Sequence, residues 1–268
     1  MKRRALIIGN MGIENSCQST FVEGVTDDLA NFYKFIRSDN GGAWNRDEVI
    51  FCRPNTINRT ELLNVISDER SKGEVDYWLV FFSGHGWADR AGESYLEVCP
   101  REKGDCDISL TDFMGALGRS RVLLISDACR AIPIYESGGK LPIVKSFSDS
   151  VKEETDYRKE CRRIYNQKIA SLPANTIYSG LSCMFGETSR DSGVYGGEYI
   201  HAVIEKAKEC IAFEKSKGNS EERITTYAYS FVHSLASPIV LAKTSGTQTP
   251  VYRGPKTWQP PFCVIPGQ

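Results

Sequence analysis

Short apolar runs alternate with longer amphipathic segments along most of the chain. Continuous apolar runs cover residues 5–8, 78–82 and 122–125, and each is short enough for a strand that is buried on both faces of a parallel sheet. Between the first two runs, apolar residues recur at helical spacing over 26–37 and again from Thr60 onward. This alternation predicts an α/β domain, with a mostly parallel sheet of about six strands and helices on both faces.

The pattern is interrupted once, in the second half of the chain. Residues 133–173 are rich in Gly, Ser, Pro and charged side chains, which predicts an exposed linker with at most one loosely attached helix. Beyond it we expect a strand, two covering helices, a closing strand and a Pro-rich tail, at 176–182, 197–215, 221–235, 248–252 and 255–268. The 268 residues are therefore interpreted as one domain, in which the linker joins segments 1–132 and 174–268.

Two of the predicted strands end in residues that can carry chemistry. One leads into Ser83-Gly84-His85-Gly86 and the other into Asp127-Ala128-Cys129-Arg130. His85 and Cys129 are thus expected just past the carboxyl ends of two strands, the edge at which open α/β sheets bind ligands. A Cys and a His side by side form a nucleophile and a general base, and flanking glycines leave backbone N–H groups free to hold an oxyanion.

The order and spacing of these motifs resemble those of a known family. His85 lies 44 residues before Cys129, and in caspases the His lies about 50 residues before a Gln-Ala-Cys motif. The chain is similar to the caspase and metacaspase superfamily of cysteine peptidases, whose clan includes legumains and gingipains. The resemblance implies a caspase-like fold in which Cys129 is the nucleophile, His85 is the general acid and base, and the N–H groups of Gly86 and Cys129 form the oxyanion hole. Ala131 stands where the family usually has Gly.

Other cysteine chemistry fits the sequence less well. A phosphatase loop needs an Arg six residues beyond Cys129, where Tyr135 stands, and a hydrolase elbow needs a Gly where Asp127 stands. Cys183 also follows a predicted strand, but no His-Gly motif is paired with it. Cys129 is therefore the candidate nucleophile.

The residues that resemble the family's specificity pocket are acidic. The segment from Gly24 to Leu29 resembles a metacaspase segment, and by that resemblance Asp28, Ser83 and Asp127 bind the side chain that precedes the cut. Carboxylates in a partly desolvated pocket pair with a basic side chain and repel an acidic one. We therefore expect cleavage after Arg or Lys. The alternatives are a peptidase that cuts after Asn or Asp, and a catalytically idle scaffold that binds a partner through the same cleft.

Composition excludes several other classes of protein. With 33 basic and 34 acidic residues, no global field favours nucleic acid or an anionic membrane. Nine cysteines without a Cys-x-x-Cys pair are typical of reducing cytoplasm and suggest neither a disulfide framework nor a zinc cage. No apolar run reaches membrane-spanning length, so we expect a soluble, cytoplasmic protein.

The resemblance also bears on cofactors and control. Calcium-dependent metacaspases carry an acidic cluster after the His motif, where this chain has only Asp105 and Asp107, with Arg101 and Lys103 among them. Hard cations need several oxygen ligands, so we expect activity without calcium or another cofactor. We expect protein substrates and control by an activating or inhibiting protein partner. Self-cleavage within 133–173, as in a zymogen, and a role in bacterial defence or cell death are further hypotheses from the family.

Overall fold

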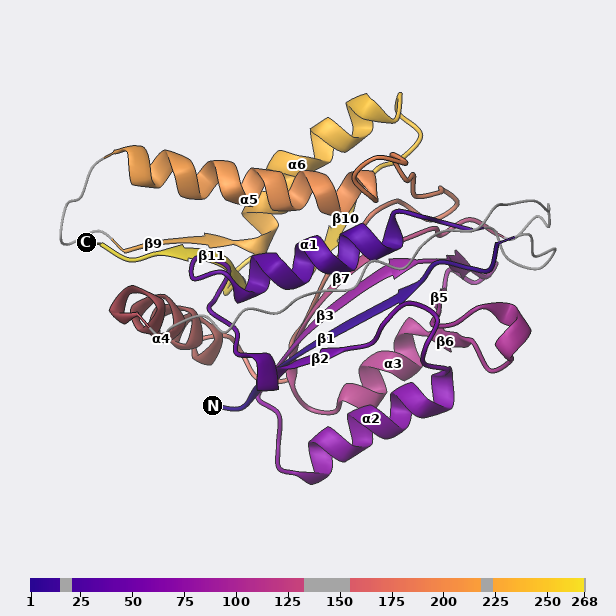
Figure 1. The fold of residues 1–268 in the computed structure, drawn as a ribbon, viewed down its shortest axis with the longest axis horizontal. Coiled ribbons are helices and arrows are strands. Elements are labelled where there is room, and N and C mark those ends of the chain that lie inside the picture. The colour runs from indigo at the N-terminus through magenta and orange to yellow at the C-terminus, as the bar shows by residue number, and fades with distance from the viewer. Residues whose placement is uncertain (15–20, 133–154, 218–223, 268) are drawn as a thin grey trace.

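The centre of the protein is a six-stranded sheet in the order β10-β8-β7-β3-β1-β2 (Figure 1). The computed structural model describes residues 1–14, 21–132, 155–217 and 224–267. The strands, in chain order, are β1 Arg3–Asn10, β2 Val49–Phe51, β3 Tyr77–Gly84, β7 Arg121–Ala128, β8 Ile177–Leu181 and β10 Val251–Arg253. Neighbouring strands are parallel except for β10, which pairs antiparallel with β8. The predicted α/β class and mostly parallel six-stranded sheet are confirmed.

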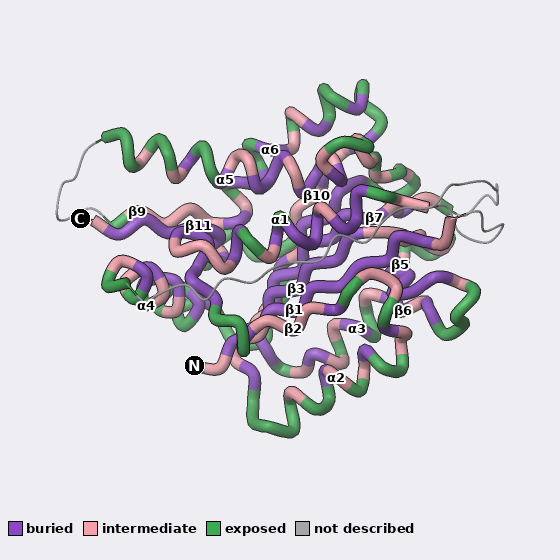
Figure 2. The backbone as a smooth tube through the Cα atoms, viewed as in Figure 1, coloured by how far each residue is buried: buried purple, intermediate pink, exposed green. Residues whose placement is uncertain are grey.

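Helices cover both faces of this sheet (Figure 1). One layer contains α1 Val25–Arg37, α4 Asp156–Ala170, α5 Glu198–Ser216 and α6 Tyr229–Lys243, and the other contains α2 Arg59–Ser71 and α3 Leu110–Leu117. Successive side chains of β1 point to opposite faces of the sheet. Ala5 and Ile7 pack in the core beneath α1, whereas Leu6 and Ile8 pack in the core with α2 and α3. The central strands are therefore buried on both faces (Figure 2), as their continuous apolar runs predict.

Two smaller sheets and two short 3-10 helices complete the fold. The first sheet, β4 Gly86–Ala88, β5 Ser94–Glu97 and β6 Asp107–Ser109, directly follows β3, and the second pairs β9 Thr225–Ala228 with β11 Pro261–Ile265. The 3-10 helices are η1 Arg46–Glu48 and η2 Arg101–Lys103. Every helix within the described ranges is too short or too polar to span a bilayer.

Two predictions about the C-terminal third are wrong. The helix expected over 221–235 begins only at Tyr229, because the β-branched and aromatic residues before it form β9 and pair with β11. Phe231 and Leu235, expected on its buried stripe, are exposed, whereas Val232 and Ala236 are buried. The segment expected to be a tail instead supplies β11, all of whose residues are buried.

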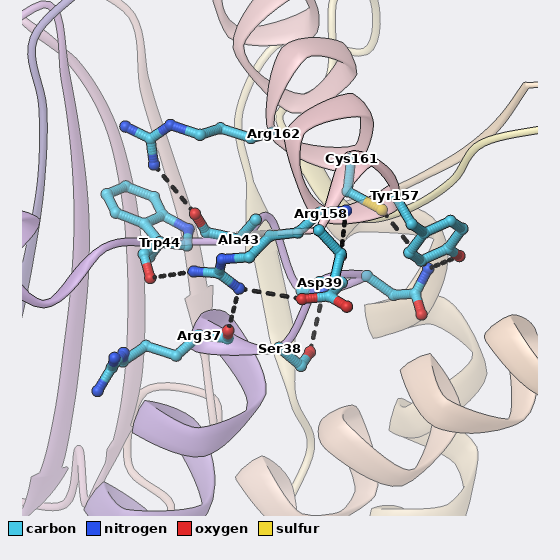
Figure 3. A network of polar contacts seen from close by, with 12 residues as sticks. Arg37, Ser38, Asp39, Ala43, Trp44, Tyr157, Arg158, Cys161 and Arg162 are labelled. Atoms are coloured by element: carbon cyan, nitrogen blue, oxygen red, sulfur yellow. Dashed lines mark hydrogen bonds and ion pairs between the residues drawn. The ribbon is translucent and has the colours of Figure 1, made fainter. Parts of the chain in front are cut away.

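The expectation of an exposed, loosely attached segment does not hold for α4. Residues 133–154 lie outside the described part of the chain, but the following helix packs against the first segment. Arg158, which is only 6% exposed, donates hydrogen bonds to the carbonyl oxygens of Arg37 (2.8 Å) and Trp44 (3.0 Å) and to the carboxylate of Asp39 (3.0 Å), as Figure 3 shows. The helix also buries an apolar stripe, Cys161, Ile164, Tyr165 and Ile169, in the core beneath it. A guanidinium with three acceptors can be buried, so α4 docks through polar bonds as well as through this stripe.

A second ion-pair cluster joins α4 to β1 through Glu48. Arg162 donates to both carboxylate oxygens of Glu48 at 2.6 Å, and Arg3 reaches the same carboxylate at 3.2 Å. Burial alone would raise the pKa of Glu48, but the bonds and charges of the two arginines outweigh it and hold the pKa at about 2. The ionised carboxylate therefore stabilises the fold.

We predict that Glu48→Gln lowers the free energy of unfolding by roughly 3 kcal/mol at pH 7. Because the folded-state pKa is depressed, this stabilisation is complete above the unfolded value of 4.5 and is lost as the pH falls towards 2. Urea titrations at several pH values measure it, and Glu160→Gln, in an exposed pair with Arg163 on the same helix, serves as the control. A loss that is the same at pH 3 and pH 7 would contradict the ionic role.

Candidate active site

Two neighbouring strands deliver His85 and Cys129 to the same edge of the sheet. In the parallel pair β3 and β7, Ser83 is in register with Asp127, so the next residues leave the sheet together. Gly84, the last residue of β3, has φ +136°, and a side chain there would collide with the carbonyl oxygen of Asn10. A glycine is thus required at the turn that presents His85.

The loops that follow these strands also contact each other. A Cβ atom on Gly86 would lie only 2.9 Å from the carbonyl oxygen of Cys129, and the N–H of Ala88 donates to the carbonyl of Ala131 (3.1 Å). The main chains of Gly86 and Cys129, the two expected oxyanion donors, are therefore adjacent.

A cavity of about 330 Å³ opens at this edge and brings the predicted side chains together. Its lining includes the two expected reactive residues and the three expected pocket residues, but not Gly86: His85, Cys129, Asp28, Ser83 and Asp127. Thiol and imidazole thus share one cavity with the carboxylates of Asp28 and Asp127, and a third acid, Asp191, also lines it. This is the spatial arrangement that the two sequence motifs predict.

Each carboxylate of the cavity is held by two hydrogen bonds. Asp28, in the first turn of α1, accepts from the Ser83 hydroxyl (2.6 Å) and from the N–H of Gly197 (2.9 Å). Asp127 accepts from the N–H of Ile200 (2.9 Å) and from the Ser189 hydroxyl. The donors come from β3 and from residues 189–200, so the two acids join both segments of the chain.

Burial raises the pKa of both carboxyl groups. For Asp28, desolvation and the negative charge of Asp127 outweigh its hydrogen bonds and place the pKa well above its ordinary value. For Asp127, desolvation outweighs its bonds to Ser189 and Ile200 and gives a pKa of about 6. Full ionisation of the pair is unfavourable in the empty cavity, and a cation in the cavity would favour it.

The Cys129 thiol is partly buried beside the same acids. Burial raises its pKa, an N–H of Ser189 that donates to the sulfur (3.3 Å) lowers it, and the charge of Asp127 raises it further. The net shift is upward, so the resting group is a thiol that needs a base to become a nucleophile. Cys183 is fully buried with a pKa of about 12, which fits a structural role.

The loop at 188–191 belongs to the site, although none of its residues is among the predicted site residues. Asp191 lines the cavity and accepts hydrogen bonds from the N–H groups of Gly24 and Gly193, both at 2.8 Å. Its charge contributes to the raised pKa values of Asp28 and Asp127. No local signal distinguishes Asp191 from an ordinary loop acid.

The acids that remain in the region of the expected calcium cluster have other partners. Asp105 accepts from the N–H and hydroxyl of Thr60, and Asp107 accepts from the indole N–H of Trp87. Among the described residues, no group of three or more His, Cys, Asp or Glu side chains is placed to hold a metal ion. These acids do not fit a calcium site, and independence of calcium stays a prediction.

The sequence model of the caspase domain matches residues 2–254. The chain belongs to the caspase domain family. The resemblance that His85 and Cys129 indicate is thereby confirmed, and it extends over both segments. This is a family of cysteine peptidases.

Two solved structures share the fold of this caspase domain. Caspase-1 from Spodoptera frugiperda aligns with a TM-score of 0.54 at 14% identity, over 94% of this chain and 86% of that one. A protein from Geobacter sulfurreducens aligns with the same TM-score and identity, over 99% of this chain and 100% of that one. No curated protein sequence matches significantly. At this identity the likeness shows the fold alone.

We predict that iodoacetamide alkylates Cys129 of the native caspase domain at least about tenfold faster than any other described cysteine, because the other seven are buried. The experiment uses a Cys17→Ser background, since Cys17 lies outside the described residues. Peptide mass spectrometry after timed labelling measures the rates, and labelling in denaturant shows that every thiol can react. Equal rates at Cys129 and Cys183 would contradict this geometry.

Proposed function

We propose that the protein is a cysteine endopeptidase that cuts peptide chains after Arg or Lys. The observation that carries the proposal is the shared cavity, in which Cys129 and His85 lie beside the buried carboxylates of Asp28 and Asp127. The first two residues supply the nucleophile and base of peptide cleavage, and the acids supply a complement to a cation.

The chemistry follows the expected roles of the two reactive side chains. His85 takes the proton of the Cys129 thiol, and the sulfur attacks the peptide carbonyl carbon to form a C–S bond. The N–H groups of Gly86 and Cys129 hold the resulting oxyanion. His85 returns the proton to the leaving amine as the C–N bond breaks, and then takes a proton from the water that hydrolyses the thioester. The thiol is restored at the end of the cycle.

The preference for a basic side chain follows from the charges of the cavity. A guanidinium or ammonium group pairs with the carboxylates of Asp28 and Asp127. An acidic side chain would bring a third negative charge into a cavity in which ionisation of both acids is already unfavourable. Since a bound cation stabilises the ionised acids, binding of a basic substrate releases protons at mildly acidic pH. Substrate affinity should therefore depend on pH.

Four further expectations stay predictions: cytoplasmic location, which rests on the composition, and control by a protein partner, processing of the linker, and a role in bacterial defence or cell death, which rest on the family. Of the linker 133–173, in which a cut is expected, residues 133–154 lie outside the described part of the chain. A catalytically idle scaffold and cleavage after Asn or Asp are outcomes that the experiments below distinguish.

We predict that Cys129→Ala abolishes turnover of fluorogenic peptides with Arg before the reporter group, because no other described thiol lines the cavity. Cys210→Ala, on the covering helix α5, serves as the matched control and should retain wild-type turnover. A peptide library read by mass spectrometry identifies the residue before each cut. Exclusive cleavage after Asn or Asp would overturn the specificity, and an inert wild type would favour the idle scaffold.

We predict that Asp28→Asn and Asp127→Asn each lower kcat/KM for Arg peptides by at least about 100-fold, because each removes a desolvated charge that faces the substrate cation. For the wild type, KM should rise as the pH falls through about 6, since protonation of Asp127 removes the same charge. Initial rates between pH 5 and 8 measure both effects. A KM that does not change over this range would contradict a role for Asp127 in substrate binding.

A further inference from the structure

The small sheet β4-β5-β6 continues the chain directly after His85, and its register places a row of polar side chains on one face. Trp87 pairs with Tyr95, and their rings stack with centroids 4.1 Å apart. Directly opposite residues of antiparallel strands have side chains on the same face, and so do residues two apart along a strand. Because His85 is two residues before Trp87, its side chain is expected on this face too.

Glu97 is the residue opposite His85 in this register. Its N–H donates to the carbonyl oxygen of His85 (3.0 Å), one step beyond the pair of Gly86 with Leu96. Side chains paired in this way have Cβ atoms about 5 Å apart. The Glu97 side chain is therefore expected next to the imidazole that serves as base in the proposed function.

The Glu97 carboxylate is buried and held in one position. Glu97 is 7% exposed, and its carboxylate forms a bidentate ion pair with Arg101, at 2.5 and 3.2 Å. Asp107, opposite Glu97 on β6, accepts the indole N–H of Trp87 and lies 3.9 Å from Arg101. Arg101 is 25% exposed, so water screens its charge more than that of Glu97.

The charge of Glu97 also acts on the nucleophile. It is one of the charges that raise the pKa of the Cys129 thiol. A negative charge there opposes the thiolate but stabilises the imidazolium that forms when His85 takes the thiol proton. Among the described residues, the small sheet also carries Arg101 and Asp107, and the cavity that His85 lines contains five other titratable or charged groups: Asp28, Asp127, Cys129, Arg190 and Asp191.

We propose that Glu97 is a positioning residue for His85: from β5 it orients the imidazole ring and stabilises its protonated form, and Arg101 holds the Glu97 carboxylate in place. The inference rests on the proposed role of His85 as general base and assigns that base its acidic partner. Glu97 does not touch the substrate. It acts through the ring, as the carboxylate partner of a histidine does in a catalytic triad.

The direct test is a titration of the histidines by NMR. The chain has three, so protein labelled with 13C at histidine Cε1 gives three signals, and a His85→Gln variant assigns the one of interest. In Glu97→Gln the titration midpoint of His85 should move to lower pH by about one unit, because the neutral amide no longer stabilises the imidazolium. In Arg101→Gln it should move to higher pH, because Glu97 is then no longer partly neutralised.

Two controls separate this role from a general effect on structure. Glu102→Gln makes the same change at an exposed position of η2 and should leave the midpoint within about 0.2 units of the wild type. Glu97→Asp keeps the negative charge, so the titration midpoint of His85 in this variant should lie close to that of the wild type. An unchanged midpoint in Glu97→Gln would overturn the proposal. If that variant does not fold, an unchanged midpoint in Arg101→Gln would overturn it instead.

Kinetics provide a second readout for an active enzyme. Glu97→Gln should lower kcat for an Arg peptide by roughly tenfold with KM within about twofold of the wild type, because the residue acts on the base and not on the substrate. A rise in KM without a loss of kcat would overturn the positioning role. The two proposals fail separately: an inert wild type with a shifted His85 midpoint would overturn only the peptidase, and an active wild type with an unshifted midpoint would overturn only the role of Glu97.

Discussion

The site depends on the burial of two like-charged side chains next to each other. Asp28 and Asp127 are 2% and 4% exposed, and moving a carboxylate from water into such a place costs several kcal/mol unless donors replace the lost hydration. The donors are the hydroxyl of Ser83 and the N–H groups of Gly197 and Ile200, with the Ser189 hydroxyl completing the set. The cavity therefore exists only when α1, β3, β7 and the loop before α5 come together.

This constraint explains why two consecutive glycines precede α5. Gly196 has φ +93°, and a side chain there would collide with the carboxylate of Asp28. A side chain on Gly197 would collide with that of Asp127. The main chain of the second segment must approach the acids this closely for its N–H groups to bind them. The proposed substrate recognition would thus depend on backbone geometry as much as on the acids themselves.

The predictable part of the site lies on the central strands, and the rest depends on contacts between distant segments. His85 and Cys129 directly follow long apolar strands, so local pattern and motif together place them. Asp191 enters the cavity through bonds to Gly24, more than 160 residues away, and no spacing rule encodes that contact. The prediction of a loosely attached segment is wrong for α4 for a related reason: its apolar stripe is sparse among charged residues, and Arg158 is buried by polar bonds, whereas a sequence pattern treats arginine as solvated.

The same negative charges that would attract a basic substrate also oppose ionisation of the nucleophile. Burial raises the pKa of Cys129 and the charge of Asp127 raises it further, so without substrate the thiol stays protonated and is a weak nucleophile. In the proposed reaction, the cation of a bound peptide offsets the charge of Asp127, so that ionisation of the Cys129 thiol becomes less unfavourable when substrate is present. Glu97 differs, because it does not line the cavity and, in the proposed arrangement, its charge acts on the imidazole. It would thus continue to favour proton transfer to His85 after substrate has bound. Asp28 and Asp127 would then select the substrate, and Glu97 would activate the base.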